Sequence, residues 1–201
     1  MKFTSREIAL TGILAGLNGA LEITLGNYLH ALHFFFTGNV MVGLNICIYM
    51  CARKSIDRKG IILIIGFITA FIKLLLGYNI NAALFIFLEA LIIEGILFIT
   101  GFNLTGNIIA SISVNLLIVL YKFGLLWVMG GSKAFTALIE FTRKFANYIH
   151  INNELIMLPF ILLLFVYSLW GIAFGLAGWR LINSKIFFNG AALNKTPPAI
   201  L

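Results

Sequence analysis

Charged side chains inside long apolar stretches offer the most chemistry in this sequence. A charge at bilayer depth costs about 2.5–3.5 kcal/mol on insertion scales, so each one needs a partner or a function. The charged residues in such stretches are Glu22, Lys73, Glu89, Glu94 and Lys122. Neutral polar residues accompany them at Asn18, Asn45 and Asn115. Carboxylates, ammonium groups and amides that converge from several helices can bind a polar small molecule by hydrogen bonds.

The depth of these charges follows from the direction of each apolar stretch. Glu22, Lys73 and Lys122 are expected in the outer half of a helical bundle, and Glu89 near its middle. Glu89 and Glu94 are about 140° apart on a helix with 3.6 residues per turn, so they cannot face the same cavity. We therefore assign Glu89 to the interior and Glu94 to a separate partner or a structural pair.

These positions predict a substrate pocket in the outer half of the bundle. Its expected substrate-binding residues are Asn18, Glu22, His30, His33, Lys73, Glu89, Asn115 and Lys122. The aromatic loop from His30 to Phe36 and the segment 130–153 would cover it. An alternative stays open, in which the same charges neutralise one another as ion pairs that fix helix packing. Lys73 could also extend its ammonium group to the outer surface.

Metal binding and enzymatic catalysis have weaker support in the sequence. His30 and His33 could bind a metal with Glu22 and His150, but two histidines three residues apart form a weakly specific pattern. The sequence contains no GxxxxGK[ST] phosphate loop, no GxSxG, no HExxH and no CxxC pair. We expect no metal, no cofactor and no enzymatic activity, and any active transport must take its energy from a partner or an ion.

The composition is that of an all-α integral membrane protein. Of 201 residues, 61% are hydrophobic and 10% are charged, and the mean hydropathy is +1.05. A water-soluble domain of this size has no need for so many apolar residues. We expect one transmembrane domain over residues 1–201 with six transmembrane helices. The expected spans are about 7–29, 37–52, 60–77, 82–102, 107–129 and 154–181.

The distribution of basic residues predicts the orientation of these spans. Four basic residues lie in the short segment 53–59, which follows the second span. Cytoplasmic loops carry an excess of Lys and Arg, so this segment and both termini are expected on the cytoplasmic side. The last outer loop, 130–153, has apolar residues at helical spacing among charges, which is typical of an amphipathic segment at the interface.

The first span carries two distinct stripes of residues. One stripe of small residues lies within about 80° on a helix. Its members are Ala9, Gly12, Gly16 and Gly19. Small residues in this arrangement allow another helix to approach closely, so the stripe predicts a docking face for a partner. The second stripe is more polar and includes Asn18 and Glu22.

The start of the chain, KFTSREIALTGILAGL, leads from a short basic segment into this small-residue helix. Together with six expected spans in about 200 residues, it resembles the substrate-binding membrane subunit (S component) of a bacterial energy-coupling factor (ECF) type ABC transporter. The resemblance in the number and arrangement of spans extends over the whole chain, whereas the resemblance in sequence motif is confined to about the first 20 residues. The chain starts Met-Lys-Phe and lacks the Met-His start of the cobalt and nickel branch.

The resemblance implies capture of a vitamin or related micronutrient for ATP-driven uptake across the cytoplasmic membrane. The partners would be a coupling membrane subunit, docked on the small-residue stripe of the first span, and two ATPase subunits. Gly stands where the family favours an Ala-x-x-x-Ala pattern. Two other classes stay open: a membrane enzyme or enzyme subunit that acts on a lipid or isoprenoid through Glu89, Glu94 or the histidines, and an ion-coupled carrier that uses Glu22 or Glu89.

Overall fold

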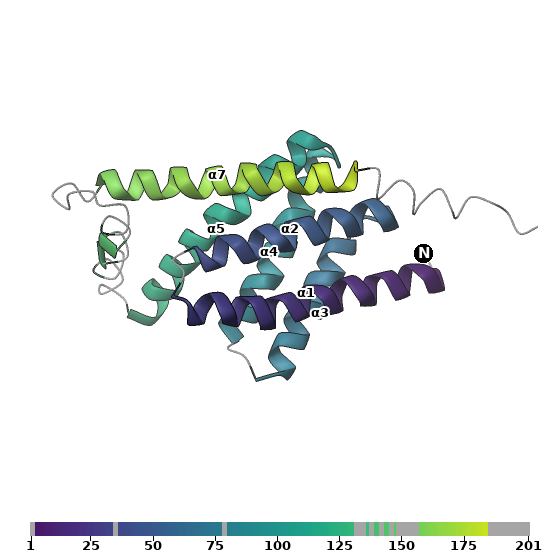
Figure 1. Cartoon of the computed structure of the whole chain (residues 1–201), viewed down its shortest axis with the longest axis horizontal. Helices are drawn as coiled ribbons and strands as arrows, with labels where there is room; N and C mark the ends of the chain where they lie inside the picture. The colour runs from purple at the N-terminus through teal and green to yellow at the C-terminus, as the bar shows by residue number, and fades with distance from the viewer. Residues whose placement is uncertain are drawn as a thin grey trace, which may run out of the picture.

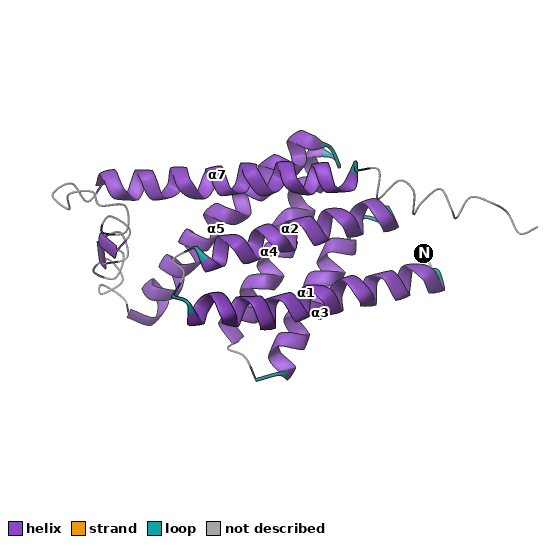
Figure 2. Ribbon diagram, viewed as in Figure 1, coloured by secondary structure: helices purple, strands orange, loops and turns teal. Residues whose placement is uncertain are grey.

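The computed structural model describes residues 3–33, 36–77, 80–130 and 157–184, together with 136, 139, 140, 143, 144 and 147. Within the described part of the chain the ordered elements are all helices, and no strand is present (Figure 2). The helices are α1 (Ser5–Ala31), α2 (Thr37–Ile56), α3 (Ile61–Leu75), α4 (Ile80–Thr100), α5 (Leu104–Gly130) and α7 (Met157–Ile182). Their ends lie within four residues of the expected spans.

Local hydrogen bonds determine where α1 begins. The Thr4 hydroxyl accepts from the Glu7 backbone N–H at 3.2 Å, and the Glu7 carboxylate accepts from the Thr4 backbone N–H at 2.7 Å. This reciprocal pair is a capping box, which satisfies two backbone donors that a helix start leaves unpaired. Arg58, from the segment after α2, donates to the same Glu7 carboxylate at 2.6 Å. The start of α1 is therefore tied to the connection between α2 and α3.

The connection between α2 and α3 is a tight corner. Asp57 ends α2 with a φ of 47°, and Gly60 precedes α3 with a φ of 87°. Glycine adopts this left-handed backbone conformation without steric cost. The Glu94 carboxylate of α4 accepts from the backbone N–H groups of Gly60 at 2.6 Å and Ile62 at 3.2 Å. A carboxylate at this position also interacts favourably with the positive, N-terminal end of the α3 dipole.

The six helices named above, all within the described residues, close into a ring. The order of packed neighbours is α1, α2, α7, α5, α4, α3 and back to α1. In Figure 1, α1, α2 and α7 lie side by side across the front, and α3, α4 and α5 cross behind them. Helix α2 also contacts α3 and α5, so four helices surround it. Most of its side chains are buried, including Ile46, Tyr49 and Met50.

Several glycines allow these helices to pack closely. A Cβ atom on Gly171 of α7 would lie 2.6 Å from the Cα atom of Ile112 on α5. A Cβ on Gly66 of α3 would overlap the Cβ of Ala90 on α4, and one on Gly43 of α2 would overlap the ring of Phe174 on α7. Small residues at helix crossings are characteristic of membrane helix bundles, where van der Waals packing supplies much of the association energy.

Among the residues that the structure describes, four helical segments are long and apolar enough to cross a bilayer. They are Ser5–Ala31, Ile80–Thr100, Leu104–Tyr121 and Phe160–Ile182. These features are those of an integral membrane protein. Helix α2 is less apolar than α3, α4 and α5, and it carries the buried polar residues Asn39 and Asn45 among its apolar core residues. Helix α3 has 15 residues and is about 22 Å long, shorter than a hydrocarbon core of about 30 Å.

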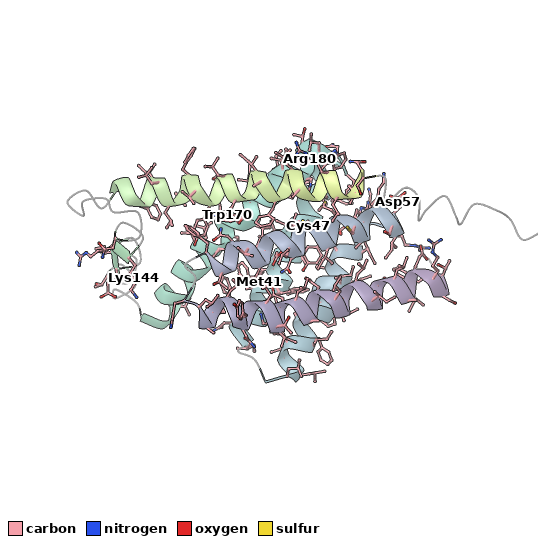
Figure 3. All side chains as sticks on the ribbon, viewed as in Figure 1. Met41, Cys47, Asp57, Lys144, Trp170 and Arg180 are labelled. Atoms are coloured by element: carbon pink, nitrogen blue, oxygen red, sulfur yellow. The ribbon has the colours of Figure 1, made fainter. Side chains whose placement is uncertain are left out.

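One end of the bundle collects the basic residues of the α2–α3 corner and the start of α1. Figure 1 shows that the N-terminal end of α1 and the C-terminal ends of α2 and α7 point to the same end of the bundle. Asp57 and Arg180 are both labelled there in Figure 3. Lys59 lies over the ring of Phe98 on α4, 4.5 Å from its centroid. The expected amphipathic segment 130–153 falls largely outside the described residues.

The crossing of α3 and α4 generates a stability prediction. Gly66→Ala places a methyl group that overlaps the Cβ of Ala90, so the two backbones must separate. We expect a loss of about 1–3 kcal/mol and a melting midpoint lowered by roughly 2–12 °C, measured by thermal unfolding in detergent. Gly95→Ala is the control, because a Cβ at Gly95 has no described atom within 4 Å. Equal melting midpoints for the Gly66→Ala and Gly95→Ala variants would contradict the close packing of α3 against α4 at Gly66.

Candidate functional site: a buried polar cluster

Four helices bring charged and amide side chains together inside the bundle. The Lys73 ammonium group on α3 donates to Oε2 of Glu22 on α1 at 2.6 Å. The Asn45 amide nitrogen on α2 donates to Oε1 of Glu22 at 2.9 Å and to Oε2 of Glu89 on α4 at 3.1 Å. One amide thus joins two carboxylates. We call Glu22, Asn45, Lys73 and Glu89 the carboxylate cluster.

The carboxylate cluster is enclosed by protein. Asn45 is fully buried, and Glu89 and Glu22 are 1% and 7% exposed. Glu89 lies near the middle of α4, about 14 Å along the axis from the first residue, Ile80. Lys73 is near the end of α3 and has a side chain that is 12% exposed. Its side chain is therefore the most exposed of the three charged side chains in the cluster.

A second polar layer lies one helical turn from the carboxylate cluster. Asn18 precedes Glu22 by four residues, and Tyr49 follows Asn45 by four, so each pair shares a helix face. The Asn18 amide donates to the Tyr49 hydroxyl and to the Thr69 hydroxyl, both at 3.4 Å. Asn18, Tyr49 and Thr69 are fully buried. The polar face of α1 therefore faces α2 and α3.

Several acceptor oxygens in these two layers are buried without a hydrogen-bond partner among the described residues. They are Oε1 of Glu89, Oδ1 of Asn45 and Oδ1 of Asn18. A buried polar atom without a partner costs about 1–3 kcal/mol, and more when it is charged. In native proteins such atoms are few and call for an explanation in terms of function, strain or a bound group.

Asn115 does not join the carboxylate cluster. Its carbonyl accepts from the Asn39 amide at 3.0 Å, and its amide donates to the Ser111 carbonyl at 2.9 Å. Asn107 donates to the Gly175 carbonyl on α7 at 2.6 Å. These residues form a separate polar seam between α2, α5 and α7. The expected lining of one pocket is thus divided between two places.

The remaining expected pocket residues have different surroundings. His30 lies in the last turn of α1 and His33 just after it, and both are exposed, whereas Glu22 is buried. His150 lies outside the described residues. Lys122 belongs to α5, but its side chain lies outside the described part of the structure. The two histidines are therefore not part of the carboxylate cluster.

Phe36 was expected in a loop that covers the pocket, but it does not cover the carboxylate cluster. It is 8% exposed and packs against Tyr167 and Trp170 of α7, with ring centroids 6.1 and 6.2 Å away. Its neighbours Phe34 and Phe35 lie outside the described residues. Phe36 therefore anchors the start of α2 to α7 and belongs to the hydrophobic core.

The small-residue stripe on α1 is mostly open. Ala9, Gly12 and Gly16 are exposed, and a Cβ at either glycine has no described atom within 4 Å. Gly19 differs, because it is buried and a Cβ there would lie 3.4 Å from the Ile72 side chain. The expected docking face is therefore shorter than predicted, since Gly19 packs inside the bundle against α3.

The structure also contains an apolar groove between α3 and α4. It has a volume of about 220 Å³ and an entirely apolar lining. The lining includes Phe67, Phe71, Leu74, Ile80 and Phe87. The groove offers no polar group to orient a polar ligand, which separates it from the carboxylate cluster.

Of the four residues in the carboxylate cluster, Asn45 is the one that was absent from the expected substrate-binding residues. Its sequence signal is a polar residue in an apolar helix, four residues before Tyr49. That signal shows a polar face, but it does not show that α1 and α4 both pack against that face. Comparisons of the chain with protein-family models, characterised proteins and solved structures found no match.

The ion pair in the cluster generates a double-mutant prediction. Lys73→Met leaves the Glu22 carboxylate buried without its cation, which should lower the unfolding free energy by about 3–5 kcal/mol. Glu22→Gln combined with Lys73→Met removes both charges, and should cost less than the sum of the two single changes. Thermal unfolding of the four proteins in detergent measures this coupling.

The Glu7–Arg58 pair is the matched control, because its N···O distance is also 2.6 Å but its side chains are 17% and 26% exposed. Ion pairs that water reaches are worth about 0.2–1 kcal/mol, so in this partly exposed pair Glu7→Gln and Arg58→Met should couple weakly. If the two cycles give equal coupling, the Glu22–Lys73 pair is not a buried ion pair in the folded protein.

Proposed function

We propose that this chain is the substrate-binding membrane subunit of an ECF-type transporter, which captures a vitamin-like small molecule for ATP-driven uptake. The observation that carries the proposal is the outward face of α1. Ala9, Gly12 and Gly16 form an exposed strip, and exposed Ile8 and Ile13 border it. α1 packs against α2 and α3 on its other side, so this strip is free to meet another membrane helix.

The arrangement of α1 links such a docking face to a binding site. The helix presents small residues outward, while Asn18 and Glu22 of the same helix face inward to the polar layers. A force applied by a partner on the outer face of α1 would therefore reach the ligand-binding side chains through one rigid element. This geometry suits a subunit that is captured and reoriented by a coupling partner.

The membrane orientation belongs to the same proposal. We place all six described helices in the bilayer of the bacterial cytoplasmic membrane. Helix α3 is too short to span the hydrocarbon core alone, so we expect the neighbouring helices to complete the span around it. Arg53, Lys54, Arg58 and Lys59 mark the cytoplasmic end, together with the start of α1 and the end of α7. The carboxylate cluster would then lie in the outer half of the bundle.

The docking face generates a partner prediction. Gly12→Leu or Gly16→Leu adds a bulky side chain to an exposed strip and leaves the buried polar layers untouched. The tagged wild-type chain, purified from membranes of its source organism, should carry a membrane subunit and two ATPase subunits in defined proportion. Each variant should lose these partners by about tenfold or more, because helix packing at small residues tolerates no bulky side chain.

Gly95→Leu is the control, since Gly95 on α4 is also exposed and open. It should keep the partners. Retention of the partners by Gly12→Leu and Gly16→Leu would show that the strip faces lipid only. Transport by the chain alone, driven by an ion gradient, would favour the ion-coupled carrier instead.

A further inference from the structure

The carboxylate cluster has a clear imbalance between hydrogen-bond donors and acceptors. Glu22 and Glu89 supply four carboxylate oxygens, which accept hydrogen bonds when ionised. The described contacts to these oxygens come from Lys73 and from the Asn45 amide nitrogen. The atoms without partners in the described structure, Oε1 of Glu89 and Oδ1 of Asn45, are both acceptors. The site therefore lacks donors.

The charges show the same imbalance. Two carboxylates are joined through one amide, and Lys73 is the cation that contacts the pair at Glu22. A buried carboxylate without a cation is strongly destabilised, so a second positive group at Glu89 would be favourable. A donor-rich cation satisfies both requirements, because an ammonium group offers three hydrogens and no acceptor.

Lys73 is placed so that it can leave the cluster. It is two residues from the end of α3, and its side chain is the most exposed of the charged members, at 12% against 8% for Glu22. A lysine near a helix end can extend its ammonium group to the membrane surface. Glu22 then stays paired only if another cation takes the place of Lys73. Glu22, Asn45 and Glu89 lie deeper in their helices and have no such freedom.

We propose that the carboxylate cluster binds a protonated nitrogen group, an ammonium or amidinium, of the captured small molecule, and that Lys73 occupies this position when the molecule is absent. The inference rests on the proposed function, because it names the substrate class of the same site. It reverses the predicted role of Lys73, which changes from a substrate-binding residue to a tethered competitor. Glu22 and Glu89 are the residues that recognise the substrate.

The test uses n-butylammonium, which reproduces the end of the lysine side chain, with n-butanol as its neutral analogue. The full-length wild-type protein in lipid nanodiscs should show a saturable rise in melting midpoint with n-butylammonium chloride. Neither n-butanol nor sodium chloride at the same concentration should produce it. Lys73→Met should bind the amine about threefold or more tightly, because its competitor is gone. Glu22→Gln should bind it about tenfold or more weakly.

Glu7→Gln is the control, because Glu7 forms its ion pair with Arg58 at the far end of α1, and it should respond like wild type. The inference is overturned if the wild-type protein shows no saturable response, if butanol acts equally, or if Lys73→Met binds more weakly. The comparison of n-butylammonium with n-butanol and sodium chloride on the wild-type protein tests the inference even if Glu22→Gln fails to fold. None of these readouts involves ATPase partners, so failure here and failure of the partner prediction are separate results.

Discussion

The structure depends on one constraint: charges removed from water must be satisfied by one another. Glu22, Lys73 and Glu89 come from three helices, and Asn45 of a fourth connects the two carboxylates. Each of these groups would be costly if its helix faced lipid, so the cluster specifies which faces of α1, α2, α3 and α4 must meet. Apolar packing alone is less specific, since Leu and Ile fit many helix rotations. The close glycine contacts at Gly43, Gly66 and Gly171 then bring the helices to their final separation.

The same constraint separates two kinds of polar group. Glu94 accepts two backbone hydrogen bonds at the start of α3, and Glu7 completes a capping box and an ion pair, so both are explained by structure. The seam around Asn115 joins α2, α5 and α7 largely through amide and carbonyl groups. Both places keep buried acceptors without a partner in the described structure, among them Oδ1 of Asn39 and Asn107 in the seam. The carboxylate cluster differs because it is charged: it holds two carboxylates and one lysine, and the unpartnered atom at Glu89 belongs to a carboxylate. This difference is the physical reason to place ligand binding there.

Much of the fold could be predicted from the sequence, because continuous apolar runs broken by Gly, Asn and basic residues mark helix lengths directly. Helical period also separated Glu89 from Glu94, and the structure places them toward different neighbours. The candidate site was harder to predict, because the depth of a residue along its helix does not indicate which helices become neighbours. Asn115 was expected beside Glu89 but pairs with Asn39, and Gly19 was expected outside but packs on Ile72. Neither outcome follows from one helix considered alone.

We propose that the carboxylate cluster binds a small molecule. The most direct measurement is the content of small molecules released from the purified, folded protein, quantified by mass spectrometry for wild type and Glu89→Gln. We expect about one nitrogen-containing cation per wild-type chain, and about tenfold or more less of it in Glu89→Gln at an unchanged amount of folded protein. A released molecule present in equal amounts in both proteins, or one that is anionic, would contradict this proposal.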